Sequence, residues 1–157
     1  MKTYYGLTDI NDLEKLAVKV CDCLGHGNNL TAVDLLVETA GAETIRGTFQ
    51  DSTKYVAMGL TQFDKMPFYD IRDRTSKRNK VKVYECFGIH LDYIEWTDLR
   101  YNPLLALIMT RLKYLLVREH IPESFEDRAV YWKKYYNSYL GKGTPEHYIE
   151  MNRKFMA

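Results

Sequence analysis

The apolar run that follows Pro103 constrains the fold more than any other segment. From Pro103 to about Glu119, apolar side chains recur every three or four residues, interrupted once by an arginine, and this spacing predicts a helix with one buried face. The recurring positions are Leu104, Leu107, Ile108, Arg111, Leu112 and Leu115. Pro122 breaks the helix, because proline lacks the backbone N–H that a helix interior needs. A helix this apolar must be covered by other elements.

Six further segments have the spacing or the end signals of helices. They cover roughly residues 9–24, 30–39, 64–74, 76–88, 124–139 and 145–155. Residues 41–52 are rich in Gly, Thr, Asp and Gln without a clear period, so we expect a loop with short extended pieces at most. Alternation of apolar and polar residues at 81–84 leaves a strand open there. The sequence predicts one mainly α domain, residues 1–157, with at most a small β-hairpin.

Composition excludes several classes of protein. The chain has 157 residues, of which 46% are hydrophobic and 27% charged, as is typical of one globular domain with a substantial core. Its net charge of +1 exerts no overall attraction on nucleic acid or membrane. The chain shows no apolar run of signal-peptide or membrane-span length, so something else would carry it to a substrate outside the cytoplasm.

The cysteines and histidines do not form a recognisable metal or redox motif. Cys21, Cys23 and Cys86 lack the spacing of a zinc or disulfide-exchange site, and we interpret them as reduced thiols that fill apolar space. The four histidines are scattered along the chain without paired ligand spacing. We therefore expect no metal and no cofactor.

The stretch 72–82 is strongly basic. It contains six Lys or Arg residues and one Asp. A run of this kind is typical of a solvated helix face, and binding of an anionic polymer such as nucleic acid or teichoic acid is the alternative. Aromatic residues do not alternate with the basic ones, which argues against nucleic acid as the partner.

Glu38 ends an apolar helical run and is the first candidate for chemistry. The apolar residues before Glu38 direct the helix into the core, so we expect its last turn where core meets surface, at the wall of a cleft. Burial beside apolar side chains raises the pKa of a carboxyl group, as a general acid for glycosidic bond cleavage requires. The alternative is an ordinary solvated glutamate at a helix end.

Three short motifs follow one another along the chain. They are Glu38-Thr39-Ala40-Gly41, Gly59-Leu60-Thr61-Gln62 and Tyr136-Asn137. Together they resemble the soluble lytic transglycosylase family of the lysozyme-like superfamily, with its Glu-Ser-Gly, Gly-Leu-Met-Gln and Ala-Tyr-Asn-Ala-Gly types of motif. The resemblance covers roughly residues 28–145 and is nearest to compact single-domain members from bacteriophages; the loop 42–54 and the basic stretch look particular to this chain. Thr39, Thr61 and Ser138-Tyr139 depart from the family pattern.

The resemblance implies a lysozyme-like α-helical domain that cleaves peptidoglycan between N-acetylmuramic acid and N-acetylglucosamine. Glu38 would protonate the glycosidic oxygen and then act as base toward the muramyl C6 hydroxyl, which leaves a 1,6-anhydro end without a second carboxylate. The residues implied to bind or position the substrate are Thr39, Gly59, Leu60, Thr61, Gln62, Tyr136 and Asn137. Gln62 would bond the sugar, Thr39 and Tyr136 would orient the acid or the N-acetyl group, and Asn137 would shape the helix end.

Two alternatives stay open. A muramidase-type hydrolase on the same fold would need a water and usually a second carboxylate about 5–10 Å away, for which Glu43, Asp51 and Asp64 are the candidates. A structural or wall-binding virion module would keep the fold with little activity, and the departure at Ser138-Tyr139 motivates it. The implied partners are peptidoglycan strands and other phage virion proteins, with no nucleic acid. The implied location is a phage particle or the host periplasm and wall, either as phage DNA enters the host or during lysis.

Overall fold

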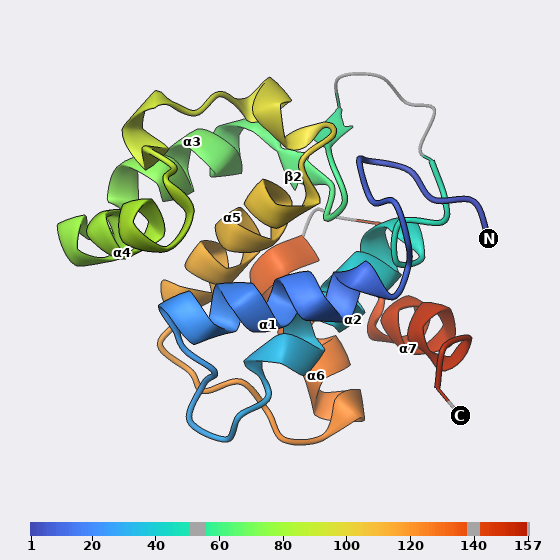
Figure 1. The fold of residues 1–157 in the computed structure, drawn as a ribbon. Helices are drawn as coiled ribbons and strands as arrows, with labels where there is room; N and C mark the ends of the chain where they lie inside the picture. Colours follow the sequence, from blue (N-terminus) through green and yellow to red (C-terminus); the bar gives the residue numbers. More distant parts are fainter. Residues whose placement is uncertain (51–55, 138–141, 157) are drawn as a thin grey trace.

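The computed structural model describes residues 1–50, 56–137 and 142–156. This part of the chain is mainly α-helical with one small antiparallel hairpin, which confirms the predicted mainly α fold class (Figure 1). The helices are α1 (Asp12–Leu24), α2 (Ala32–Thr44), α3 (Lys65–Arg74), α4 (Lys77–Phe87), α5 (Pro103–Leu115), α6 (Phe125–Trp132) and α7 (Pro145–Arg153). The short elements are the strands β1 (Ala57–Met58) and β2 (Phe63–Asp64), the 3-10 turns η1 (Leu91–Tyr93) and η2 (Trp96–Leu99), and the π turn η3 (Lys133–Asn137). No helix in the described ranges is long and apolar enough to cross a membrane.

Helix α5 occupies the centre of the molecule. Figure 1 shows it among the other helices, and its residues from Leu105 to Leu112 are all buried, so this part of the helix is covered on every side and not on one face alone. Asn102 caps its first turn by accepting a 3.0 Å hydrogen bond from the backbone N–H of Leu105. The helix ends at Leu115, short of the predicted end near Glu119, because the next N–H groups bond to carbonyls only three residues back.

Helix α2 runs to Thr44, so the prediction of a loop from residue 41 is wrong in its first turn. Gly41 lies inside the helix where α7 packs against it, and a Cβ atom on Gly41 would lie 1.9 Å from Oδ1 of Asn152. This glycine therefore permits close contact between two helices and does not break one. The helix ends where Ile45 adopts a left-handed backbone with a φ of 51°.

A disulfide between Cys23 and Cys86 joins α1 to α4, with the two Cα atoms 6.3 Å apart. The interpretation of all three cysteines as reduced thiols is therefore wrong, and only Cys21 is a buried free thiol. Cys21 and Cys23 point to different faces of α1 because positions two apart on a helix differ by about 200°. The packing of α1 against α4 holds Cys23 and Cys86 at a separation that a disulfide spans without backbone movement.

The remaining helices lie close to their predicted ranges, with two differences. The strand alternative at 81–84 is wrong, because these residues lie inside α4. The last long predicted helix begins as expected after Ser124, whose side chain caps it, but its α-helical part ends at Trp132. The π turn η3 continues the chain from there to Asn137. Ser138 and Tyr139 lie outside the described residues.

Candidate active site

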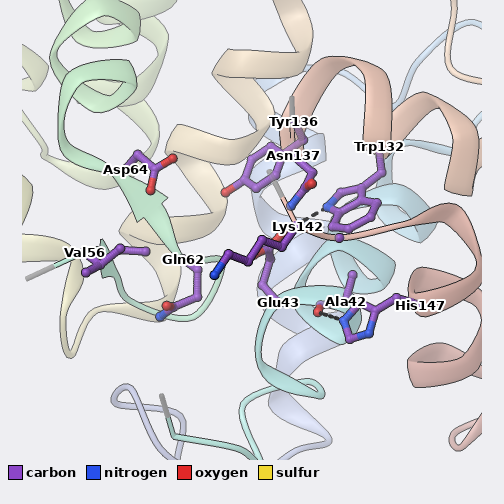
Figure 2. Close-up of a pocket in the computed structure, with 12 residues that line it drawn as sticks. Ala42, Glu43, Val56, Gln62, Asp64, Trp132, Tyr136, Asn137, Lys142 and His147 are labelled. Carbon is purple, nitrogen blue, oxygen red and sulfur yellow. Dashed lines mark hydrogen bonds between the residues drawn. The ribbon is translucent and has the colours of Figure 1, made fainter. Parts of the chain in front are cut away.

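A pocket of about 370 Å³ brings together residues that are far apart in the sequence. Its lining consists of Ala42, Glu43, Val56, Ala57, Gln62, Asp64, Trp132, Tyr136, Asn137, Lys142, Gly143 and His147. The end of α2, the β1–β2 hairpin, the junction of α6 with η3 and the first turn of α7 supply most of these residues. Figure 2 shows Gln62 and Asp64 on one side, Trp132 and His147 on the other, and Glu43 between them.

Glu43 lies in the last turn of α2 and faces this pocket (Figure 2). Its Oε2 atom accepts a 3.1 Å hydrogen bond from the indole Nε1 of Trp132. Burial raises the pKa of Glu43 to about 8; the Trp132 hydrogen bond and the ammonium of Lys113 oppose this rise, and the charge of Asp64 adds to it. A carboxyl group with this pKa is mostly protonated at neutral pH, as a general acid must be.

The turn of the hairpin presents Gln62 to the pocket. Gln62 has a left-handed backbone with a φ of 49°, and its Nε2 donates a 2.9 Å hydrogen bond to the carbonyl of Gly59. Gly59 has a φ of 81°, and a Cβ atom there would lie 2.5 Å from the carbonyl oxygen of Leu99. A larger residue would therefore clash at this position, and the glycine fixes the shape of the turn. Leu60 and Thr61 are fully buried and do not line the pocket.

Two hydroxyl groups anchor this turn to neighbouring elements. The hydroxyl of Thr44 donates a 2.7 Å hydrogen bond to the carbonyl of Leu60, from the end of α2. The hydroxyl of Tyr136 donates a 2.7 Å hydrogen bond to the carbonyl of Thr61, from η3. Both carbonyls belong to buried residues, so each bond satisfies a polar group that water does not reach. The position of Gln62 is thus determined by α2 and η3 together.

The π turn η3 places Tyr136 and Asn137 at the pocket. Nζ of Lys113 donates a 3.0 Å hydrogen bond to the Tyr136 carbonyl and lies 4.4 Å from the centre of the Tyr136 ring. Burial raises the pKa of Tyr136, so its hydroxyl stays neutral. Oδ1 of Asn137 accepts a 2.9 Å hydrogen bond from Nζ of Lys133. Departures from α-helical geometry of this kind are frequent at functional sites.

The other polar side chains of the pocket come from both of its sides. Asp64 is exposed at the start of α3, and Lys142 extends across the pocket in Figure 2. Nε2 of His147 lies 2.9 Å from the carbonyl oxygen of Ala42 and donates a hydrogen bond to it. Acidic, basic and amide groups therefore converge on one space of ligand size.

Glu38 does not line this pocket. Its side chain is 7% exposed and forms a two-point ion pair with Arg128 of α6, at 2.7 Å from Nε to Oε1 and 2.9 Å from Nη2 to Oε2. Oε1 also accepts a 2.7 Å hydrogen bond from the hydroxyl of Tyr148 in α7. The expected position of Glu38 at the wall of a cleft is therefore corrected: α2 continues for more than another turn, and α6 and α7 close over this carboxylate.

The structure divides the predicted site residues into two groups. Three of them, Gln62, Tyr136 and Asn137, line the pocket. Five do not, namely Glu38, Thr39, Gly59, Leu60 and Thr61. Thr39 is buried in the core, where its hydroxyl donates to the Leu35 carbonyl at 2.7 Å and lies 2.9 Å from the hydroxyl of Tyr114. Asp51 and Ser138-Tyr139 fall in the parts of the chain that the structure does not describe.

Sequence reasoning placed Glu43 only as a second carboxylate of a hydrolase, and it missed Lys142 and His147 as pocket residues. The available signal was a repeat, because α2 carries the pair Glu-Thr twice, five positions apart (43 − 38). The interval from the second glutamate to Gln62 is 19 residues (62 − 43), shorter than the 24 (62 − 38) from the first. Choosing the second pair requires knowing that the helix continues to Thr44.

Among the described residues, no group of three His, Cys, Asp or Glu side chains is arranged to hold a metal ion. Comparisons of the chain with protein family models, with curated proteins and with solved structures found no match in any of the three. The case for a function therefore depends on the pocket and on the motif resemblance.

Proposed function

We propose that the chain is a peptidoglycan lytic transglycosylase in which Glu43 is both the acid and the base. One observation carries the proposal: the partly buried carboxyl group of Glu43 shares a pocket with Gln62, Tyr136 and Asn137. These three residues belong to the second and third motifs of the resemblance. If the first motif is assigned to Glu43-Thr44 instead of Glu38-Thr39, each of the three motifs contributes at least one residue to this pocket.

The reaction requires one proton carrier. Protonated Glu43 donates its proton to the glycosidic oxygen, which leaves with the next sugar as the C1–O bond breaks. The carboxylate then takes the proton of the muramyl C6 hydroxyl, whose oxygen forms the new bond to C1 and closes the 1,6-anhydro ring. Glu43 ends protonated, as it began, and no water is consumed. The raised pKa of about 8 suits the first step, because the acid form prevails at neutral pH.

The side chains around Glu43 suit a sugar ligand. The amides of Gln62 and Asn137 can both donate to and accept from hydroxyl and N-acetyl groups. Trp132 holds one oxygen of the Glu43 carboxyl group through its indole N–H, which restricts the rotation of the acid. A pocket with a few directed polar groups and fixed geometry orients its ligand before the reaction begins.

A muramidase-type hydrolase is the second candidate, and one observation favours it. Asp64 lines the same pocket, and its charge contributes to the raised pKa of Glu43. A second carboxylate therefore lies within electrostatic range of the first. In a hydrolase, Asp64 would activate a water or stabilise positive charge on the sugar.

The disulfide supports a place of action outside the reducing cytoplasm. A bond such as that between Cys23 and Cys86 persists in oxidising compartments, including the bacterial periplasm. We propose that the chain acts on the host cell wall, from a phage particle or after release during lysis. Its partners would be peptidoglycan strands and other virion proteins.

The test is digestion of purified peptidoglycan, with mass spectrometry of the released fragments. Wild type is compared with Glu43→Gln, with Asp64→Asn and with Glu126→Gln, which changes an exposed glutamate of α6 as a matched control. We expect wild type and Glu126→Gln to release anhydro ends. Glu43→Gln should lower the rate about 10²- to 10⁴-fold, the usual contribution of a general acid, without lowering the unfolding temperature.

Each other outcome points to a different conclusion. If wild type releases reducing ends and Asp64→Asn does not, the protein is the hydrolase and not the transglycosylase. A folded wild type that binds peptidoglycan and releases no fragments would indicate the wall-binding virion module. Full activity in Glu43→Gln would reject Glu43 as the proton carrier.

A further inference from the structure

Three aromatic side chains form an exposed cluster where α4 meets η1, and we name this cluster the α4–η1 platform. The rings of Tyr84 and His90 are stacked, with centroids 4.3 Å apart and planes inclined by 30°, and the ring of Tyr93 meets His90 at 6.0 Å. Tyr84 is 49% exposed and Tyr93 is 81% exposed. Rings this exposed contribute little to the core, and a contiguous group of them is typical of a binding surface.

A hollow of about 300 Å³ lies at the platform. Besides the three rings, it is lined by Lys77, Lys80, Val81, Leu91 and Asp92. Nζ of Lys80 forms a 2.7 Å ion pair with one carboxylate oxygen of Asp92, while Lys77 makes no ion pair with any described residue. The hollow thus combines aromatic faces, a lysine that forms no ion pair within the described part of the chain, and a carboxylate acceptor.

The basic residues of the stretch 72–82 have different surroundings, and two of its lysines line the hollow. Arg72 lies 4.8 Å from the ring of Tyr69 and donates a 3.1 Å hydrogen bond to the carbonyl of Ile94. Arg74 pairs with Asp70 at 3.1 Å. These two arginines contact α3 and the residue that follows η1, whereas Lys77 and Lys80 at the start of α4 line the hollow. The stretch is therefore not a uniformly solvated helix face.

We propose that the α4–η1 platform is an accessory binding site for a saccharide unit that carries a carboxylate. The C–H face of a sugar ring packs on the rings of Tyr84 and Tyr93, sugar hydroxyls bond to Asp92, and the carboxylate pairs with Lys77. A phosphate backbone fits less well, because the Asp92 carboxylate repels it and the net charge of +1 attracts it little. The identity of the polymer, peptidoglycan with its lactyl or stem-peptide carboxylates, rests on the proposed function.

The platform is separate from the Glu43 pocket. Figure 1 shows α4 and α7, which carries the pocket residue His147, on opposite sides of the molecule. The disulfide from Cys23 to Cys86 fixes α4 to α1, so the platform is held at a set place. A polymer bound at the platform keeps its other units at high local concentration near the pocket. The site should therefore matter for an insoluble polymer and not for a short soluble oligosaccharide.

The test is sedimentation of the protein with purified insoluble peptidoglycan, in a Glu43→Gln background that leaves the polymer intact. Tyr93→Ala removes the most exposed ring of the platform. Tyr101→Ala is the matched control, because Tyr101 is 65% exposed and does not line the hollow. We expect Tyr93→Ala to weaken retention about fivefold, which corresponds to about 1 kcal/mol, and Tyr101→Ala to leave it unchanged. Lys77→Gln should weaken retention at low salt only.

Equal retention of the parent and Tyr93→Ala, or equal losses in both tyrosine variants, would overturn the proposal. Binding of a single-stranded oligonucleotide through Tyr93, without binding of peptidoglycan, would also overturn it. Because the readout is sedimentation, a wild type that releases no fragments would reject the proposed function and leave this result intact. Normal digestion together with retention that is independent of Tyr93 would support the proposed function and reject the accessory site.

Discussion

Helix α2 presents the same dipeptide, Glu-Thr, in two different environments. At Glu38-Thr39 the carboxylate is closed in by α6 and α7 and paired with the guanidinium of Arg128. At Glu43-Thr44 the carboxyl group faces a pocket and receives a hydrogen bond from a neutral indole. The residues are identical, and only the partners that the fold brings to them differ.

The two carboxyl groups differ in the side chains that contact them. Glu38 is the more buried of the two, and its carboxylate pairs with the guanidinium of Arg128 and accepts a hydrogen bond from the hydroxyl of Tyr148. Glu43 is buried without a cation in direct contact among the described residues, so its neutral form is favoured and its pKa rises. The first glutamate therefore links α2 to α6 and α7, whereas the second faces the pocket with a raised pKa.

The largest expected effect is on stability at the first pair. Arg128→Met leaves the carboxylate of Glu38 buried without its cation, and removing one partner of a buried ion pair costs about 3–5 kcal/mol. We expect urea unfolding to show a loss of this size. Adding Glu38→Met to the same chain should restore much of it, because an apolar pair of similar volume has no charge to desolvate.

Glu126→Gln is the control for this comparison, since that glutamate is exposed and should change the free energy of unfolding by less than about 0.5 kcal/mol. A loss below about 1 kcal/mol in Arg128→Met would show that the ion pair is not a structural link. A double variant no more stable than Arg128→Met would show that the charge is not the cause.

The second expected effect is a pH dependence of stability that belongs to Glu43. Its pKa is raised from an ordinary value of 4.5 to about 8, so between these pH values the folded chain binds a proton that the unfolded chain has lost. The free energy of unfolding should therefore fall as pH rises from about 5 to 8, by about 2–4 kcal/mol for this group after allowance for its partial exposure. In Glu43→Gln the side chain binds no proton in either the folded or the unfolded state, so this pH dependence should disappear.

Unfolding in urea at several pH values measures this effect as the difference between wild type and Glu43→Gln. As pH rises from about 5 to 8, the free energy of unfolding of Glu43→Gln should increase relative to that of wild type. A difference that stays constant with pH would show that the carboxyl group of Glu43 is already ionised in the folded protein at pH 5, and it would argue against its role as an acid.

Much of the fold could be predicted because it depends on local patterns. The apolar spacing after Pro103 predicted the buried helix α5, and Ser124 predicted the start of α6. Prediction failed where a distant segment decides the outcome. Gly41 looks like a helix end, yet it lies inside α2, where the absence of a side chain makes room for Asn152 of α7, 111 positions later (152 − 41). The Cys23–Cys86 bond is a similar case, with a separation of 63 residues.

The candidate site divides in the same way. Gln62, Tyr136 and Asn137, which line the pocket, were predicted from the motif resemblance. The residues next to each glutamate do not indicate which of the two faces the pocket, since each is followed by threonine and preceded by small or apolar residues. Arg128 decides it, from 90 positions away (128 − 38), by taking the first glutamate into an ion pair. Only the folded chain shows which glutamate faces the pocket.

The smallest expected effect separates the two threonines. Thr39→Val breaks a buried hydrogen bond with Tyr114, and Thr44→Val breaks those with the carbonyl of Leu60 and the backbone N–H of Gly47. Each change should cost about 1–2 kcal/mol in stability. Of the two threonines, Thr44 anchors the turn that positions Gln62 and Thr39 does not. A misplaced binding group lowers the rate, so we expect about a tenfold loss of peptidoglycan cleavage in Thr44→Val and less than about twofold in Thr39→Val. Assays well below both unfolding temperatures separate the effect on activity from the effect on stability.

Equal activities in the two variants would mean that the turn keeps its shape without Thr44. A larger loss of activity in Thr39→Val would indicate that Glu38-Thr39, and not Glu43-Thr44, is the pair that acts in catalysis.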